Sequence, residues 1–155
     1  MTEAVTISQA TIDDAEEVLA LIKRAFAPVA ELYRDPEFPP LTESLASHRD
    51  CYSVRTVLKA TDAAGHIVGT VQGEARDDAC YVARLAVDPA WQRRGVARAL
   101  AAALEDAFPD TKRFELFTGH LSEETLALYR SLGYRETLRE VVDDRLTVVW
   151  MEKVR

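Results

Sequence analysis

The chain has 155 residues, of which 48% are hydrophobic and 29% charged, and its formal net charge at pH 7 is -7. This length is typical of one globular domain that buries a core without disulfides or metals, so we expect a single domain over residues 1–155. The acidic balance argues against a nucleic-acid partner, since binding to the phosphate backbone requires clustered Lys and Arg.

The first part of the chain is predicted to contain a strand, a helix and an irregular segment. The strand covers about Val5 to Ser8. Thr11 then begins a helix as its N-cap, with Asp14 three residues on as in a capping box, and apolar residues follow at helical spacing. Four prolines between positions 28 and 40 predict a break into irregular structure that would serve as a lid. A short helix over 41–49 is expected next.

The middle of the chain alternates strand-forming segments with turns. We expect strands over 53–60, 66–75 and 80–87, separated by turns at 62–65 and 76–78. The last of these strands ends at Asp88 and Pro89, because proline cannot continue a hydrogen-bond ladder. An amphipathic helix follows Gly95 and ends before Pro109.

The last part of the chain is predicted to hold a strand, a helix and two closing strands. The strand covers 114–118, Ser122 caps the helix, and Gly133 ends that helix in a left-handed conformation. The closing strands cover about 134–142 and 146–153. This order of elements predicts an α/β fold with a mixed sheet. The terminal strand could mediate self-association through a sheet edge, so we expect a monomer or a homodimer.

The segment Gln92 to Ala97 lies between a buried strand and the start of a helix. There the first backbone N–H groups have no intrahelical partner and favour an anion. Gly95 allows a diphosphate to approach the main chain, and Arg93, Arg94 and Arg98 add positive charge. The sequence matches neither a Walker loop nor the dinucleotide fingerprint Gly-x-Gly-x-x-Gly. Taken alone, it also fits a helix-start glycine beside solvated arginines.

The pattern Gln/Arg-x-x-Gly-x-Gly/Ala, preceded by an apolar strand and Val87-Asp88-Pro89, resembles the acetyl-CoA-binding motif of the GNAT N-acetyltransferase superfamily. The segment 122–134 looks like that family's second cofactor motif, in which a helix carries a tyrosine, here Tyr129, four residues before a glycine and an aromatic. The resemblance implies acetyl-CoA as co-substrate. It also implies the GNAT fold, with six to seven strands splayed between the cofactor strand and the next, and about four helices.

The same resemblance implies which residues contact the coenzyme. Backbone groups of Leu85, Ala86 and Val87 would bind the pantetheine arm. The diphosphate and its surroundings would be contacted by Gln92, Arg93, Arg94, Gly95, Val96, Ala97 and Arg98. Many relatives carry asparagine near the start of the second helix, where this chain has Ser122 and Thr125. We expect Thr125 to contact the cofactor and Ser122 to act chiefly as a cap.

Acetyl transfer needs an unprotonated amine, hydrogen-bond donors for the oxyanion and an acid for the leaving thiolate. A phenol with a pKa of about 10 can protonate a thiolate whose thiol titrates at about 8.5, so Tyr129 is the predicted acid. Some relatives have a glutamate where this chain has Tyr81. Glu74 on the preceding strand is therefore the predicted base, with His120 as the alternative.

The segment 26–50 is expected to line the acceptor site, because it varies most among such enzymes. It combines aromatic residues with the acids Glu31, Asp35, Glu37 and Glu43, which suits an amine with an apolar body. The residues predicted to contact the acceptor are Tyr33, Phe38 and Tyr81.

The sequence thus predicts an N-acetyltransferase that acts by direct attack of a primary amine in a ternary complex. Cys51 and Cys80 have no recognisable base partner and no metal-ligand spacing, so we expect neither an acyl-enzyme nor a metal. Two other readings stay open: a non-catalytic acyl-CoA-binding regulatory module, and a nucleic-acid-binding domain, which the acidity disfavours. No apolar run approaches the roughly 18 residues of a membrane span. Because Met1 to Ala4 also lack a basic signal segment, we expect a cytoplasmic protein.

Overall fold

The computed structural model describes residues 4–155. The stretch Met1 to Glu3, which entered the expectation about a signal segment, lies outside the described residues.

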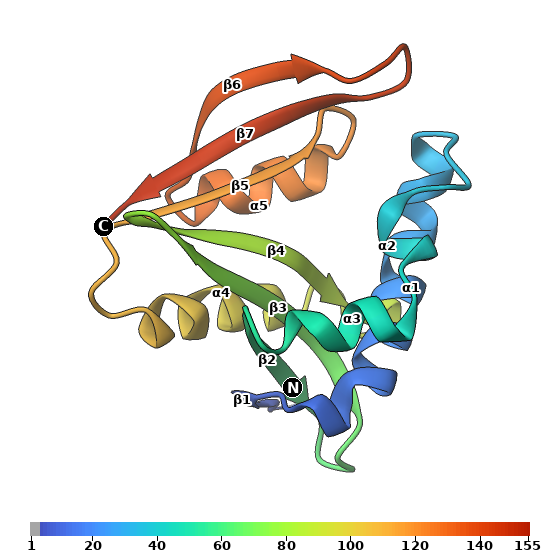
Figure 1. Cartoon of the computed structure of the whole chain (residues 1–155), viewed down its shortest axis with the longest axis vertical. Coiled ribbons are helices and arrows are strands. Elements are labelled where there is room, and N and C mark those ends of the chain that lie inside the picture. The colour runs from blue at the N-terminus through green and yellow to red at the C-terminus, as the bar shows by residue number, and fades with distance from the viewer. Residues whose placement is uncertain (1–3) are drawn as a thin grey trace.

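Seven strands form one mixed sheet in the order β1-β2-β3-β4-β5-β7-β6 (Figure 1). The strands are β1 Thr6–Gln9, β2 Thr56–Thr61, β3 Ile67–Arg76, β4 Ala79–Val87, β5 Arg113–Gly119, β6 Arg135–Val141 and β7 Thr147–Val154. Neighbouring strands run antiparallel except β4 and β5, which run parallel. The expected mixed sheet of six to seven strands is confirmed.

The parallel pair β4 and β5 is joined only at the start of both strands. Its register pairs Ala79 with Arg113, Cys80 with Phe114 and Tyr81 with Glu115. Beyond Tyr81 the two strands diverge, as Figure 1 shows. The expected splay between the cofactor strand and the next is therefore confirmed, and it divides the sheet into a half formed by β1 to β4 and a half formed by β5, β7 and β6.

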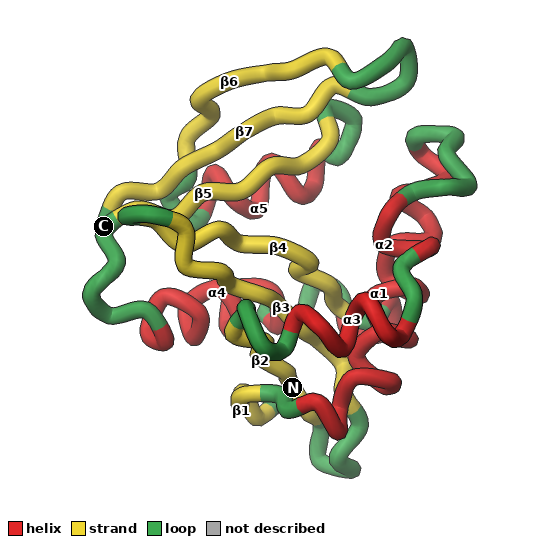
Figure 2. The backbone as a smooth tube through the Cα atoms, in the orientation of Figure 1, coloured by secondary structure: helices red, strands yellow, loops and turns green. Residues whose placement is uncertain are grey.

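Helices cover both faces of the sheet (Figure 2). They are α1 Ala15–Leu32, α2 Pro39–Thr42, α3 Leu45–Cys51, α4 Val96–Ala107 and α5 Glu123–Ser131, with 3-10 turns at Ile12–Asp14 and Pro89–Trp91. Side chains alternate between the faces of a strand. On β2, Val57 packs in the cluster that includes α1, whereas the next residue, Leu58, packs in the cluster that includes α4. Hence α1 and α4 lie on opposite faces.

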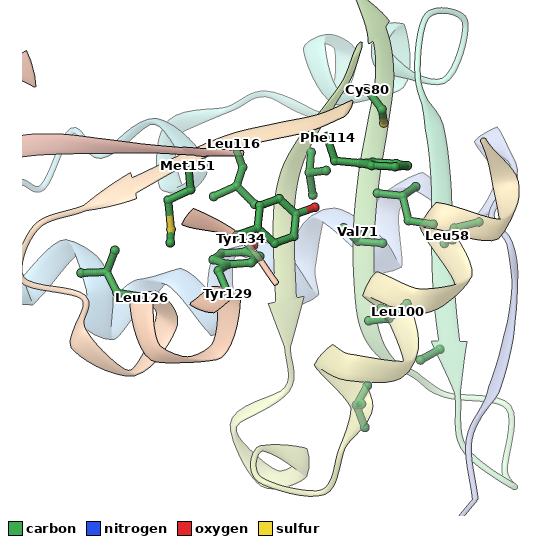
Figure 3. Packing of buried hydrophobic residues seen from close by; sticks show 14 of the residues in the cluster. Leu58, Val71, Cys80, Leu100, Phe114, Leu116, Leu126, Tyr129, Tyr134 and Met151 are labelled. Carbon is green, nitrogen blue, oxygen red and sulfur yellow. The ribbon is translucent and has the colours of Figure 1, made fainter. Parts of the chain in front are cut away.

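The larger hydrophobic cluster holds the two halves of the sheet together (Figure 3). Leu100 of α4 and Leu116 of β5 belong to it, as does Tyr129 of α5. On β3, Gly69 and Gly73 allow α4 to approach closely, because an added Cβ at either position would lie 2.8 Å from a side-chain atom of that helix. α4 is thus held directly against β3, the neighbour of the strand β4 that leads into the predicted cradle.

The predicted helix break at Pro28 is wrong, because α1 continues through this residue to Leu32. Proline lacks an N–H and removes one helical hydrogen bond. Here Pro28 is exposed, while the turn after it buries Ala30 and leads to the buried Tyr33. This burial stabilises the last helical turn despite the missing bond. The short helix expected at 41–49 is divided in two, since Ser44 accepts a hydrogen bond from the Ser47 N–H and caps α3.

The expectation that the terminal strand lies at a sheet edge is also wrong. β7 pairs with β5 on one side and with β6 on the other, so β6 forms the edge. The two closing strands form a hairpin whose second strand enters the sheet. Every residue of β6 is exposed.

Candidate active site

The loop between β4 and α4 places a helix start beside open space. Arg93 and Gly95 adopt left-handed conformations with φ of 64° and 83°, and Gly95 is the N-cap of α4. An added Cβ at Gly95 would meet no atom within 4 Å, so the backbone conformation rather than crowding requires glycine here. The N–H groups of Val96, Ala97 and Arg98 open the helix and have no intrahelical acceptor.

A cavity of about 640 Å³, which we call the cofactor cavity, lies between this loop and α5. Most of the predicted cofactor residues line it, namely Leu85, Val87, Gln92, Arg93, Gly95, Val96, Ala97, Arg98 and Thr125. Two do not: Ala86 lines a second cavity instead, and the Arg94 guanidinium lies 5.0 Å from the Trp91 ring. The structure thus gathers one strand end, one loop, the start of α4 and one face of α5 around a single space.

Two of the arginines predicted to attract phosphate hold other groups in this structure. Arg93 donates to the Glu124 carboxylate at 2.7 Å, and Arg98 donates to the Ser131 hydroxyl at 2.7 Å. The Arg93 and Glu124 side chains are 82% and 84% exposed, so their ion pair contributes little to stability. A phosphate that enters the cavity can therefore replace Glu124 as the partner of Arg93 at small cost.

A second cavity of about 510 Å³, which we call the acceptor cavity, adjoins the first. Both cavities are lined by Leu85, Val87, Gln92, Thr125 and Tyr129. The three residues predicted to contact the acceptor, Tyr33, Phe38 and Tyr81, line the acceptor cavity, where Phe26 and Phe117 add apolar surface. Tyr129 therefore lies where the two spaces meet.

The phenol of Tyr129 is buried in the wall between the cavities. Tyr129 is 6% exposed, and the centre of its ring lies 5.4 Å from that of the Tyr134 ring in an edge-on arrangement. Figure 3 shows the two rings beside each other. Burial, and to a smaller extent the neighbouring Tyr81, raises the pKa of Tyr129 well above its usual value. The phenol therefore keeps its proton at neutral pH and can donate it.

Glu74, the predicted base, is held by two arginines at the end of β3. Its carboxylate accepts hydrogen bonds from Arg55 Nε at 2.8 Å and Arg76 Nε at 3.0 Å. These bonds lower the pKa of Glu74, which makes the carboxylate a weaker proton acceptor. Glu74 does not line either cavity, whereas both of its arginines line the acceptor cavity.

His120, the alternative base, is bound to the neighbouring strand. Its Nδ1 accepts a hydrogen bond from the Thr147 N–H at 3.0 Å. The ring lies 6.0 Å from the Tyr33 ring, but His120 does not line either cavity. This contact occupies one of the two ring nitrogens that could accept a proton.

Tyr33 connects α1 to the far half of the sheet. Its ring is 2% exposed, and its hydroxyl accepts a hydrogen bond from the Leu121 N–H at 2.9 Å and lies 2.9 Å from Ser122 Oγ. A side chain at Gly119 would overlap the Tyr33 hydroxyl, so glycine is needed there for this approach.

The expectation that Ser122 is chiefly a cap is wrong, since Ser122 occupies the N-cap position of α5 but its side chain makes no capping bond.

The acidic residues expected at the acceptor site do not line the acceptor cavity. Glu31, Asp35, Glu37 and Glu43 are absent from its walls, because α1 continues past Pro28 and turns Tyr33 inward. Three arginines that sequence reasoning missed line it instead, Arg55, Arg76 and Arg84. They lie on three different strands or loops, and no spacing in the sequence marks them as a group.

Arg84 lies in a bulge of β4. Opposite β3, the register passes from Ala83 with Gln72 to Ala86 with Thr70, so β4 carries one extra residue. Arg84 has a left-handed φ of 54° at this point. The bulge changes which face each following side chain takes and frees the strand from regular pairing beside the splay.

The two cysteines lie outside both cavities. Cys51 has a neighbour that the sequence did not reveal, since its sulfur lies 4.0 Å from Nδ1 of the buried His48. Burial raises the pKa of Cys51 and lowers that of His48, so the pair favours a neutral thiol and a neutral imidazole. Burial also raises the pKa of Cys80 to about 11. A thiol that stays protonated is a poor nucleophile.

Residues 4–155 lack both a membrane-spanning helix and a metal-binding cluster. In that part of the chain, no helix is both long and apolar enough to cross a membrane. The same residues contain no cluster of three or more His, Cys, Asp or Glu side chains suited to a metal ion.

Several solved structures share this fold. The ribosomal-protein-S18-alanine N-acetyltransferase of Escherichia coli is 23% identical with a TM-score of 0.81, covering 97% of this chain and 94% of its own. A phosphinothricin acetyltransferase of Sinorhizobium meliloti, solved with AcCoA, is 16% identical with a TM-score of 0.79, covering 99% and 89%. The PaiA N-acetyltransferase of Thermoplasma acidophilum, solved with coenzyme A, is 16% identical with a TM-score of 0.70, covering 98% and 99%.

A comparison with curated proteins gave no match. A family model described as an acetyltransferase (GNAT) domain matches residues 42–155, which is well over half of the chain. The match includes the cradle, the splayed strands and the helix that carries Tyr129. The chain therefore belongs to the GNAT acetyltransferase family.

Proposed function

We propose that the protein transfers an acetyl group from acetyl-CoA to a primary amine by direct attack in a ternary complex. The observation that carries this proposal is the position of Tyr129 in the wall shared by the cofactor and acceptor cavities. A thioester placed from one side and an amine placed from the other would meet beside one buried phenol. Holding two reactants in this way removes much of the entropic barrier to their reaction.

The cofactor cavity has the features that a linked diphosphate requires. The N–H groups at the start of α4 supply donors, and the open space at Gly95 allows oxygen atoms to approach them. Arg93 and Arg98 line the same space and add positive charge. We propose that the pantetheine arm then follows β4 at Leu85 and Val87, where β5 has diverged and no longer pairs with the strand.

Tyr129 would act as the acid of the reaction. The amine nitrogen attacks the thioester carbonyl carbon, the carbon–sulfur bond breaks, and the leaving thiolate takes the phenolic proton. Burial away from water raises the pKa of a phenol or a thiol, because each becomes charged when it loses its proton. The thiol of coenzyme A would experience the same burial as the phenol, so their pKa values would rise together.

The amine must lose a proton, and Glu74 stays the predicted acceptor, with His120 as the alternative. The two arginine bonds to Glu74 give it a second proposed role, which is to position Arg55 and Arg76 on the acceptor cavity. The variant Glu74→Gln separates these roles. If Glu74 is the base, this variant should lose about 100-fold or more in turnover. If Glu74 only positions the arginines, the variant should chiefly raise KM for the acceptor.

The experiment that tests the function is a screen of primary amines with acetyl-CoA, in which released thiol is measured with a thiol-reactive dye. We expect saturable coenzyme binding by calorimetry and thiol release that depends on the amine. Coenzyme binding without acceptor-dependent thiol would instead support a regulatory binding module. No heat of binding with coenzyme A or acetyl-CoA would overturn the proposal.

The names of the solved neighbours support an amine acceptor without choosing its kind. One is named for an alanine of a ribosomal protein and another for phosphinothricin. The acceptor of this chain must therefore be inferred from its own cavity.

A further inference from the structure

The acceptor cavity is positively charged, although the chain as a whole is acidic. The charged residues that line it are all arginines, namely Arg55, Arg76 and Arg84. Glu74 balances part of this charge, because it pairs with Arg55 and Arg76 from outside the cavity. An excess of positive charge remains on the walls, which repels a purely cationic amine and attracts an anion.

Arg84 has no charge partner within the described part of the chain. It is half-buried, and its guanidinium forms no hydrogen bond or ion pair with any residue of 4–155. A charge that is partly removed from water without a partner costs free energy. An anion that enters the cavity would recover this free energy, and a carboxylate can accept two parallel N–H bonds from one guanidinium.

The bulge in β4 explains where the Arg84 side chain points. Before the bulge, Val82 packs in the cluster that includes α4; after it, Ala86 packs in the cluster that includes α1. Without the extra residue, these two side chains would share a face. We place Arg84, the inserted residue, on the α1 side, in agreement with its electrostatic effect on His48 and Cys51 of α3.

The fold itself does not require an arginine at this position. A left-handed φ of 54° is strained for any residue with a side chain, and glycine would relieve that strain. The arginine thus combines a strained backbone with an unpaired charge beside a cavity. Such a combination is typical of a functional position.

Tyr81 connects the arginines to the reacting centre. The guanidiniums of Arg76 and Arg55 lie 3.9 Å and 5.7 Å from the centre of its ring. The same tyrosine interacts electrostatically with Tyr129 and with Arg84. The three arginines, Tyr81 and Tyr129 therefore all line one cavity, so a single small molecule bound there can face both the positive groups and the phenol.

We infer that the acceptor is a small primary amine that carries a carboxylate, with Arg84 as the principal contact of that carboxylate and Arg55 and Arg76 beside it. The volume of about 510 Å³ and the aromatic walls fit a small molecule with an apolar body. The inference rests on the proposed function and narrows its substrate. It replaces the expectation that the acids of segment 26–50 line the site and bind a cationic amine.

The test compares matched acceptors that differ only in the anionic group. 4-(Aminomethyl)benzoate is compared with 4-(aminomethyl)benzamide, and apolar amino acids with their amides, using kcat/KM calculated for the unprotonated amine. We expect the carboxylates to be preferred by about tenfold or more, the value of a hydrogen bond to a charged group. A dipeptide amide with an aspartate side chain tests whether the anion belongs to a peptide instead.

The variant Arg84→Gln should reduce this preference by about tenfold, and Arg84→Lys should restore part of it. The control Arg49→Gln removes an exposed arginine outside both cavities and should keep the wild-type preference. Calorimetry with acetyl-CoA verifies that each variant is folded.

Three results would overturn the inference: amides or polyamines used as well as the carboxylates, a preference that Arg84→Gln leaves unchanged, or a clear preference for the acidic dipeptide. If no amine at all is acetylated, the proposed function fails. The inference is then decided separately by calorimetry with 3-phenylpropionate, whose binding Arg84→Gln should weaken and Arg49→Gln should not.

Discussion

The two cavities that meet at Tyr129 are built in different ways. The cofactor cavity comes from one strand end, the loop that follows it, the start of α4 and one face of α5. The acceptor cavity combines α1, α2, the residue before β2, the end of β3, the bulge of β4, and residues of β5, α5 and β7. Under the proposed function, a local junction would bind the coenzyme, whereas contacts between distant segments would determine which acceptor this chain selects.

This difference also appears in the charges. In the cofactor cavity, Arg93 and Arg98 come from one loop and the first turn of the helix that follows it, so a short sequence motif reveals them. In the acceptor cavity, Arg55, Arg76 and Arg84 come from three separate places in the chain. Changes at the junction should therefore affect coenzyme affinity, and changes in the assembled part should affect the acceptor and the stability of the wall.

The largest effect is expected at Tyr129, the residue that both cavities share. Tyr129→Phe keeps the ring but removes the proton donor, so we expect turnover to fall by about 100-fold or more, with acetyl-CoA affinity within about threefold. The pKa of Tyr129 is raised, so the acid form persists as pH rises, and the wild-type rate should not decline below pH of about 10. Steady-state kinetics with calorimetry measure both; unchanged turnover would remove Tyr129 from the mechanism.

The next effect tests the assembled wall. Gly119→Ala would overlap the Tyr33 hydroxyl and break its buried contacts, and we expect unfolding to become easier by about 2–3 kcal/mol. Thermal unfolding should show it as a fall in Tm of about 2–4 °C per kcal/mol. Tyr33→Phe keeps the ring and should cost less, about 1 kcal/mol. A Gly119→Ala protein as stable as wild type would show that Tyr33 does not fix this wall.

The smallest effect is expected at Gly95, in the loop between β4 and α4, with Gly65 as a matched control. Gly95 and Gly65 have φ of 83° and 87°, and an added Cβ at either meets no atom within 4 Å. Alanine at either position should therefore cost a similar stability, about 1 kcal/mol, from backbone strain alone. Only Gly95→Ala should also weaken the binding of coenzyme A, by about tenfold, because Gly95 lines the cavity assigned to the diphosphate. Equal affinities of the two variants would place the diphosphate elsewhere.

The sequence revealed the features that depend on neighbours along the chain. The capping box of Thr11 and Asp14, the left-handed Gly133 and the strands around the cradle are all where their local patterns predicted them. Each depends on turn chemistry, capping or hydrophobic period within a few residues. The motif residues of the cofactor cavity belong to the same class.

Features that depend on contacts between distant residues could not be predicted from local sequence patterns. The helix through Pro28 depends on burial of Tyr33, whose hydroxyl meets Ser122, a residue 89 positions away. The interior position of β7 depends on how its hairpin meets β5. The bulge at Arg84 depends on register with β3. Local patterns therefore predicted the acidic residues of segment 26–50 at the acceptor site, and only the assembled fold showed arginines there.

The narrow joint between β4 and β5 has a mechanical consequence. Three paired residues on each strand connect the half-sheets at one end of the splay, and the tyrosine from α1 connects them near the other. A wedge fixed at both ends has a set width before any substrate arrives. If the pantetheine arm binds there as proposed, little reorganisation of the strands would be needed, and binding would carry no free-energy cost for separating them.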